Sequence, residues 1–127
     1  MRSLGVGMQK IKILIVEDES LIALYLQKKL TQQGYDVCML AARGEEAVNC
    51  AQSENPDVIL MDIRLDGDID GIEAARQVMS FSSAKIIFVT GQTNPEIKEK
   101  ALALKPAAFL AKPVTIHDIQ SVLKQLQ

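Results

Sequence analysis

The chain has 127 residues, enough for one domain that buries roughly two thirds of its unfolded surface. Apolar residues make up 48% and charged residues 24%, which is typical of a soluble globular protein. The net charge of −2 gives no basic surface, so direct nucleic-acid binding is not expected. No apolar run approaches the ~20 residues of a membrane span and no secretory leader is evident, so we expect a cytoplasmic protein.

The first nine residues show no periodicity and contain Ser3, Gly5 and Gly7. We predict a flexible leader over residues 1–9 and a single domain over residues 10–127.

Strand and helix patterns alternate along the rest of the chain. Short apolar runs predict strands, and apolar residues at helical spacing predict helices between them. The predicted strands are 11–16, 35–42, 58–61, 86–89 and 108–111, and the predicted helices are 20–33, 44–53, 71–79, one from 95 and one from 116 to about 126. This alternation predicts an α/β fold with a parallel sheet.

Local start and stop signals support these helices. Gly34 is a typical helix stop. Asn94 followed by Pro95 is a strong helix start, because the amide caps the helix and proline fits its first turn. Thr115 and Asp118 have the spacing of a capping box.

Four of the apolar runs end in residues that handle phosphate. The run at 11–16 is followed by Glu17 and Asp18, and the run at 58–61 by Asp62. The runs at 86–89 and 108–111 are followed by Thr90 and Lys112. Runs of this type indicate strands buried on both faces of a parallel sheet. Ligands bind at the carboxyl ends of such strands, so we expect these side chains to share one crevice.

This crevice suits a divalent cation and a phosphoryl group. Two carboxylates ~4 Å apart repel each other by about 4 kcal/mol at an effective dielectric constant of about 20. Bound Mg²⁺ or Mn²⁺ would offset that repulsion. Asp62 stands alone at its strand end and is the best candidate for a nucleophile. Lys112 and Thr90 could stabilise the phosphoryl oxygens.

The motifs around these residues resemble those of response regulator receiver domains in two-component systems. They are Ile-Val-Glu17-Asp18-Glu, Leu-Met-Asp62-Ile-Arg-Leu, Asp-Gly71, Phe-Val-Thr90-Gly and Phe-Leu-Ala-Lys112-Pro. Their order and separations make the resemblance specific over residues 10–127. It implies a doubly wound, flavodoxin-like sheet with strand order 2-1-3-4-5 and five helices.

The resemblance also implies roles for single residues. Asp62 would accept a phosphoryl group from a phosphohistidine. Asp62, Asp18 and the backbone carbonyl of Arg64 would bind Mg²⁺, with Glu17 acting through water. Lys112 and Thr90 would contact the phosphoryl group, and a cis peptide bond is expected at Lys112-Pro113.

The implied partners are a sensor histidine kinase or phosphotransfer protein, and an output domain or effector outside this chain. Such a domain catalyses only its own phosphorylation and dephosphorylation, so we do not expect a conventional enzyme. A phosphorylation-dependent dimer is one further expectation. Thr90 and Phe109 would form a switch that couples the crevice to the fourth helix, fifth strand and fifth helix.

The chain departs from the common pattern in two ways, one in the loop after Asp62 and one at Phe109. The segment between Asp62 and Gly71 carries one extra residue, and Asp66 stands where proline is usual. Phe109 stands where many relatives carry tyrosine, so that position has no phenolic hydroxyl.

Three alternatives remain open. Residues 62–73 resemble a calcium-binding EF-hand loop, but Arg64 occupies a ligand position and a strand pattern precedes the loop. A haloacid dehalogenase-type phosphatase would need a second acid where Arg64 stands. A receiver-like interaction module that is never phosphorylated is the third alternative.

The remaining reactive side chains receive ordinary interpretations. Cys38 and Cys50 have no metal-site spacing and are predicted to be buried, reduced thiols. His117 is predicted to be a solvated residue at a helix start, so the donor histidine must come from a partner.

Overall fold

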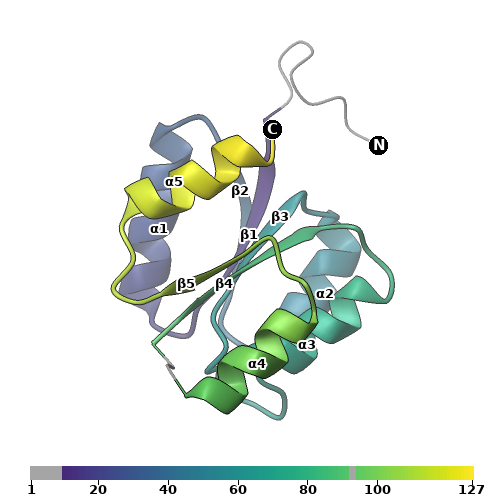
Figure 1. Ribbon diagram of the computed structural model, residues 1–127. Coiled ribbons are helices and arrows are strands. Elements are labelled where there is room, and N and C mark those ends of the chain that lie inside the picture. The colour runs from purple at the N-terminus through teal and green to yellow at the C-terminus, as the bar shows by residue number, and fades with distance from the viewer. Residues whose placement is uncertain (1–9, 92–93) are drawn as a thin grey trace.

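The computed structural model describes residues 10–91 and 94–127, so the leader predicted over residues 1–9 lies outside the described residues. Five strands and five helices alternate within the described part (Figure 1). In chain order they are β1 (Lys12–Val16), α1 (Ser20–Gln32), β2 (Asp36–Ala41), α2 (Gly44–Glu54), β3 (Val58–Met61), α3 (Gly71–Met79), β4 (Lys85–Thr90), α4 (Pro95–Ala103), β5 (Ala108–Ala111) and α5 (Ile116–Gln125).

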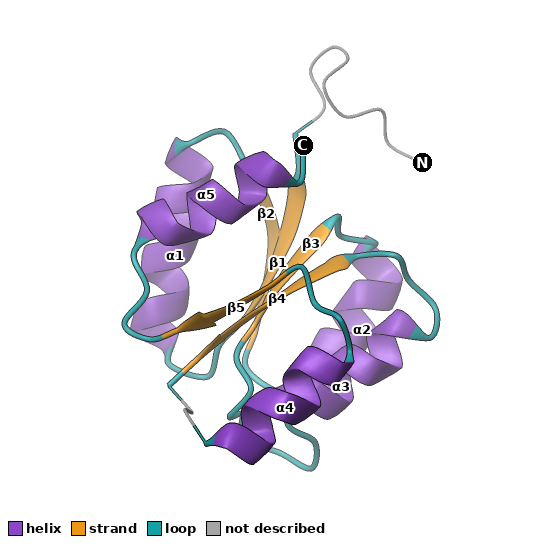
Figure 2. Cartoon of the chain, in the orientation of Figure 1, coloured by secondary structure: helices purple, strands orange, loops and turns teal. Residues whose placement is uncertain are grey.

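The strands form one parallel sheet in the order β2-β1-β3-β4-β5. Helices α1 and α5 cover one face, and α2, α3 and α4 cover the other (Figure 2). This is the doubly wound α/β fold predicted from the sequence, with the predicted strand order. The strands are parallel, so their carboxyl ends lie side by side along the same end of the sheet.

Alternate residues of the central strands supply two separate cores. In β1, Leu14 and Val16 join the core under α2 and α3, whereas Ile13 and Ile15 join the core under α1 and α5. All four side chains are at most 1% exposed. A strand that is buried on both faces needs apolar residues at every position, which explains the continuous apolar runs of β1, β3 and β4.

The prediction of burial on both faces is wrong for β5. Its residues are half-buried or exposed, because β5 lies at an edge of the sheet and pairs only with β4. The run Ala-Phe-Leu-Ala is apolar at every position, so its pattern resembles that of a central strand. The other edge strand, β2, is also only partly buried.

The predicted helix signals are confirmed. The side chain of Asn94 accepts a hydrogen bond from the Glu96 amide at 2.8 Å, and Pro95 is the first residue of α4. Thr115 and Asp118 form the capping box: each side chain accepts a hydrogen bond from the other residue's amide, at 3.0 and 3.1 Å. Gly34 follows α1 with φ = 95°. The predicted boundaries lie within two residues of the observed ones.

The two cysteines are free, as predicted, but they are only half-buried, so the predicted burial is wrong in degree. Cys38 still lies in an apolar environment, and burial raises its pKa to about 11. Burial also raises the pKa of Cys50. His117 is exposed in the first turn of α5. Thiols with raised pKa values are weak nucleophiles at neutral pH, so neither cysteine resembles a reactive site.

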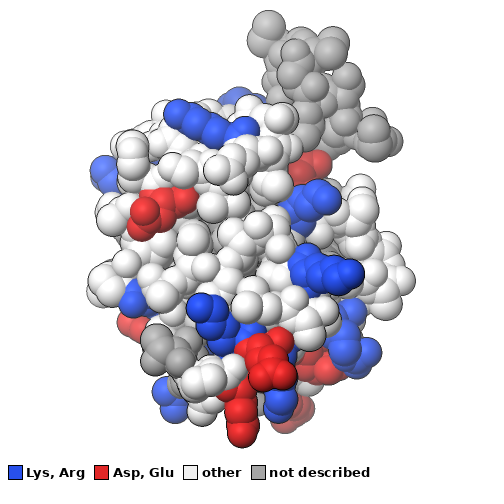
Figure 3. All heavy atoms as spheres, viewed as in Figure 1, with Lys and Arg blue, Asp and Glu red and all other residues white. Residues whose placement is uncertain are grey.

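No helix in the described ranges is long and apolar enough to cross a membrane. On the face that Figure 3 shows, basic and acidic side chains are interspersed with uncharged surface.

Candidate functional site

The carboxyl ends of β1 and β3 bring three acidic side chains together. Glu17 and Asp18 follow β1, and Asp62 follows the neighbouring strand β3. One carboxylate oxygen of each lies within 4.8 Å of the others. Glu17 and Asp62 are each only 5% exposed, and Asp18 is half-buried. Burial and the neighbouring Glu17 carboxylate raise the pKa of Asp18.

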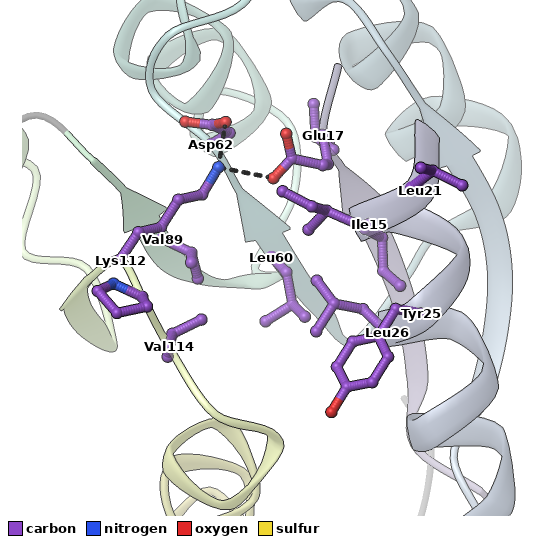
Figure 4. A pocket seen from close by; sticks show the side chains of 13 residues that line it. Ile15, Glu17, Leu21, Tyr25, Leu26, Leu60, Asp62, Val89, Lys112 and Val114 are labelled. Carbon is purple, nitrogen blue, oxygen red and sulfur yellow. Dashed lines mark hydrogen bonds and ion pairs between the residues drawn. The ribbon is translucent and has the colours of Figure 1, made fainter. Parts of the chain in front are cut away.

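Lys112 brings a positive charge to this cluster from the end of β5. Its Nζ donates hydrogen bonds to Glu17 Oε1 at 2.8 Å and to Asp62 Oδ2 at 3.0 Å (Figure 4). Burial lowers the pKa of this ammonium, but the two hydrogen bonds and the two negative charges outweigh burial and leave the pKa raised. Lys112 therefore stays charged at neutral pH. The Lys112-Pro113 peptide bond is cis, as predicted.

Backbone contacts fix the position of Asp62. The Arg64 amide donates a hydrogen bond to Asp62 Oδ1 at 3.2 Å. The Gly71 amide donates to the Ile63 carbonyl at 2.7 Å, which closes the β3–α3 loop at its base. A Cβ atom at position 71 would lie 2.0 Å from the Asp62 carbonyl oxygen. Only glycine fits there, a role that the sequence analysis did not assign to Gly71.

Two cavities meet at this cluster. The acidic cavity has a volume of about 380 Å³ and is lined by Asp18, Glu19, Asp62, Arg64, Leu65, Asp66, Gly91 and Lys112. The second, of about 310 Å³, is mostly apolar and lies between α1 and the segment after β5 (Figure 4). Asp62 and Lys112 line both cavities, so their side chains lie at the boundary between the acidic cavity and the apolar one.

Neither of the two predicted switch residues lines the acidic cavity. Thr90 is fully buried at the end of β4, and its neighbour Gly91 lines the cavity instead. Phe109 is half-buried in β5, with its ring centroid 6.5 Å from that of Phe88. The Lys98 ammonium of α4 lies 5.7 Å from the Phe109 ring centroid.

The donor set fits a hard divalent cation. Three carboxylates face the Lys112 ammonium, and the pKa of Asp18 is raised by burial and by the Glu17 carboxylate, whose repulsion a cation would relieve. Carboxylate and carbonyl oxygens are the ligands that Mg²⁺ prefers. The EF-hand alternative fails, because strand β3 precedes the loop where an EF-hand requires a helix.

Comparison with known protein families shows which family the chain belongs to. The profile of the response regulator receiver domain matches residues 13–124. The chain belongs to the response regulator receiver domain family. This receiver domain therefore belongs to two-component phosphorelay signalling, and not to the phosphatase family considered above.

Relatives of known name support the assignment. The receiver domain is 35% identical over 108 residues to the transcriptional regulatory protein PdtaR of Mycobacterium tuberculosis, which covers 85% of this chain and 52% of that protein. It is 34% identical over 116 residues to the alkaline phosphatase synthesis transcriptional regulatory protein PhoP of Bacillus subtilis, covering 91% and 48%. The chain thus spans about half the length of the curated relatives it matches.

Solved structures of receiver domains have the same fold as this chain. The receiver domain of a modulated diguanylate cyclase from Desulfovibrio desulfuricans G20 superposes with a TM-score of 0.86 at 37% identity, covering 92% of this chain and 93% of that one. A CheY-like receiver domain from Methanospirillum hungatei JF-1 superposes with a TM-score of 0.86 at 28% identity, covering 93% and 94%.

Proposed function

We propose that this receiver domain is phosphorylated on Asp62 by a partner phosphohistidine, in a reaction that depends on Mg²⁺ or Mn²⁺. The contact that supports this most directly is the 3.0 Å hydrogen bond from Lys112 Nζ to Asp62 Oδ2. It places a permanent cation beside the carboxylate of a nearly buried aspartate, where a transferred phosphoryl group would need charge neutralisation.

In the proposed step, an Asp62 carboxylate oxygen attacks phosphorus and forms the new P–O bond. The P–N bond to the donor imidazole breaks, and the leaving nitrogen keeps the electron pair. Lys112 donates a hydrogen bond to a phosphoryl oxygen, and Thr90 can donate another. Attack by water on phosphorus later breaks the P–O bond, releases phosphate and restores the carboxylate.

Asp18, Asp62 and the Arg64 carbonyl would hold the cation, with Glu17 acting through water. The cation, when bound, neutralises negative charge on the phosphoryl oxygens. Asp62 would then carry a charge near −2 in place of −1.

The proposal is tested with acetyl phosphate, a small phosphoryl donor that needs no kinase. We expect intact-protein mass spectrometry to find one added phosphoryl group in the presence of Mg²⁺ and none after chelation with EDTA. An unlabelled protein with saturating Mg²⁺ would contradict the proposal and favour the interaction module that is never phosphorylated.

Loss of one carboxylate should stabilise the metal-free protein. Because the pKa of Asp18 is raised in the folded state, its ionisation opposes folding. This penalty is absent below the ordinary pKa of the unfolded chain, grows as the pH rises toward the raised pKa, and is complete above it. Asp18→Asn should therefore unfold at a higher urea concentration than wild type at pH 7. Adding Mg²⁺ should stabilise wild type strongly and Asp18→Asn weakly, because ligands stabilise the state that binds them. Equal stabilisation of both proteins would contradict the assignment of Asp18.

We further propose that phosphorylation changes the face formed by α4, β5 and α5. Thr90 can move toward the new phosphoryl oxygens, and Phe109 can follow into the space that Thr90 leaves. Lys98 contacts Phe109 from α4, so a movement of this ring would reach the helix surface. The proposal describes a two-state element biased by a local charge.

The phosphoryl mimic BeF₃⁻ tests this coupling. Saturation with BeF₃⁻ and Mg²⁺ should shift the backbone amide NMR signals of β5 and of both flanking helices. Phe109→Leu should keep BeF₃⁻ binding but reduce the shifts in α4. Shifts confined to the residues around Asp62 would contradict the coupling.

The partner would be a sensor histidine kinase or a phosphotransfer protein in the cytoplasm. The named relatives are transcriptional regulatory proteins about twice as long as the match, which supports an output domain or effector beyond the receiver domain. A dimer that forms on phosphorylation would be one way to pass the signal on.

A further inference from the structure

The β3–α3 loop forms one wall of the acidic cavity. Arg64, Leu65 and Asp66 line that cavity, and they belong to the loop that carries the extra residue noted in the sequence. Hydrogen bonding between Gly71 and Ile63 closes the loop only at its base. Most of this loop is exposed, although its Leu65 and Ile69 side chains pack against the core under α2 and α3. A polar contact at its outer part would therefore add to these apolar ones.

Glu45, near the start of α2, makes that contact. Its Oε1 accepts hydrogen bonds from the backbone amides of Asp68 and Ile69, both at 3.1 Å. Arg43, the residue before α2, forms an isolated parallel bridge with Asp66. These contacts join the outer loop to a helix that is packed on the sheet.

The glycines at this contact indicate how tightly the two segments approach. Gly67 has φ = 107°, and a Cβ atom there would lie 2.8 Å from Glu45 Oε2. A Cβ atom at Gly44 would lie 2.6 Å from Ile69 Cγ1 and 2.9 Å from the Ile69 carbonyl oxygen. The adjacent acid, Glu46, points elsewhere and accepts a hydrogen bond from the Ala42 amide at 3.3 Å.

We propose that Glu45 is a positioning residue for the cation and phosphoryl site. By binding the amides of Asp68 and Ile69, its carboxylate holds the loop so that Arg64 and Asp66 keep their places in the cavity wall. Glu45 itself does not line that cavity; it acts through the loop. This inference rests on the proposed function, because the site it positions is the one proposed for Mg²⁺.

Three variants separate positioning from charge. Glu45→Ala removes both hydrogen bonds, and Glu45→Gln keeps an oxygen that can accept them. Glu46→Ala removes the same charge from the adjacent residue without touching the loop. Gly67→Ala places a Cβ atom against the carboxylate of an intact Glu45 at a φ of 107°, so either the Glu45 side chain or the loop must shift. It therefore disturbs the same contact from the loop side if Glu45→Ala fails to fold.

Two measurements test the proposal. Amide hydrogen exchange in the metal-free protein should speed up at Asp68 and Ile69 by about tenfold or more in Glu45→Ala, because hydrogen bonds to charged groups are among the stronger ones. Calorimetric titration with MgCl₂ should show an affinity about three- to tenfold weaker in Glu45→Ala and in Gly67→Ala. The Mg²⁺ affinities of Glu45→Gln and Glu46→Ala should stay within about twofold of wild type, because neither variant loses the contact with the loop.

Wild-type Mg²⁺ affinity in Glu45→Ala or in Gly67→Ala would overturn the inference. The inference would also be overturned if Glu46→Ala weakened Mg²⁺ binding as much as Glu45→Ala does, or if Glu45→Gln bound Mg²⁺ as weakly as Glu45→Ala. Either result would mean that the lost negative charge, and not the lost contact with the loop, weakens binding. If wild type itself binds no Mg²⁺ and takes no phosphoryl group, the proposed function fails, whereas the exchange data still report on the Glu45 contact.

Discussion

Asp62→Asn is expected to abolish labelling by acetyl phosphate in the presence of Mg²⁺. Lys112 and the Arg64 amide donate to different oxygens of Asp62, so the single oxygen of asparagine can accept one of these two hydrogen bonds. The side chain keeps its size and shape, so the fold should survive. The substitution removes the negative charge and the nucleophilic oxygen at the position that would attack phosphorus. The phosphorylated fraction, measured by intact-protein mass spectrometry, should fall below detection.

Asp70→Asn is the matched control for this prediction. Asp70 lies in the same loop, is exposed, and caps α3 by accepting a hydrogen bond from the Glu73 amide at 2.8 Å. Asparagine is an equally good cap, so this variant should label as wild type does. Labelling of Asp62→Asn at wild-type level would place the acceptor elsewhere, and loss of labelling in Asp70→Asn would mean that the effect is not specific to Asp62.

The fold could be predicted because its determinants are local. Buried parallel strands need unbroken apolar runs, and helices need caps and stops, and both signals lie in short windows of sequence. The error at β5 has a physical reason: an apolar run gives hydrophobicity but not position in the sheet. Strand order and the exposure of Ala111 depend on neighbours that are distant in sequence, and only the resemblance to a family supplied that order.

The site was predictable for those residues that end a strand. Glu17, Asp62 and Lys112 converge, as expected from the meeting of parallel strands at one edge of the sheet. The roles of Glu45 and Gly71 were missed. Glu45 is one of many surface acids in the sequence, and its partners are backbone amides more than twenty residues away. The Asp-Gly pair at 70–71 was the one available signal for a glycine with a special role.

The spacing of acids in residues 62–73 resembles an EF-hand loop, but the strand pattern before it already argued against a calcium site. Asp62, Asp66 and Asp70 have the spacing of calcium ligands, yet in the structure they do different things. Asp62 lies in the nearly buried cluster, Asp66 lines the cavity wall, and Asp70 caps α3. The spacing of acids predicts a calcium-binding loop only when a helix lies on each side of it, and here strand β3 precedes the loop.

Gly71→Ala is expected to damage both stability and the site. An added Cβ would lie 2.0 Å from the carbonyl oxygen of Asp62 and 2.8 Å from the Ile63 Cα. These are backbone atoms of a buried strand end, so no side chain can move to relieve the overlap. The cost should reach or exceed the upper part of the ~1–3 kcal/mol range for overpacked cores, measured as the free energy of unfolding in urea.

Gly91→Ala provides the comparison, because its Cβ would meet nothing within 4 Å and Gly91 is an exposed residue that lines the same cavity. It should change the free energy of unfolding by no more than about 0.5 kcal/mol. If Gly71→Ala still folds, relief of the overlap must displace the backbone that carries Asp62, so its Mg²⁺ affinity should fall as well. A Gly71→Ala protein with wild-type stability and wild-type Mg²⁺ affinity would mean that Gly71 does not fix the position of the acceptor.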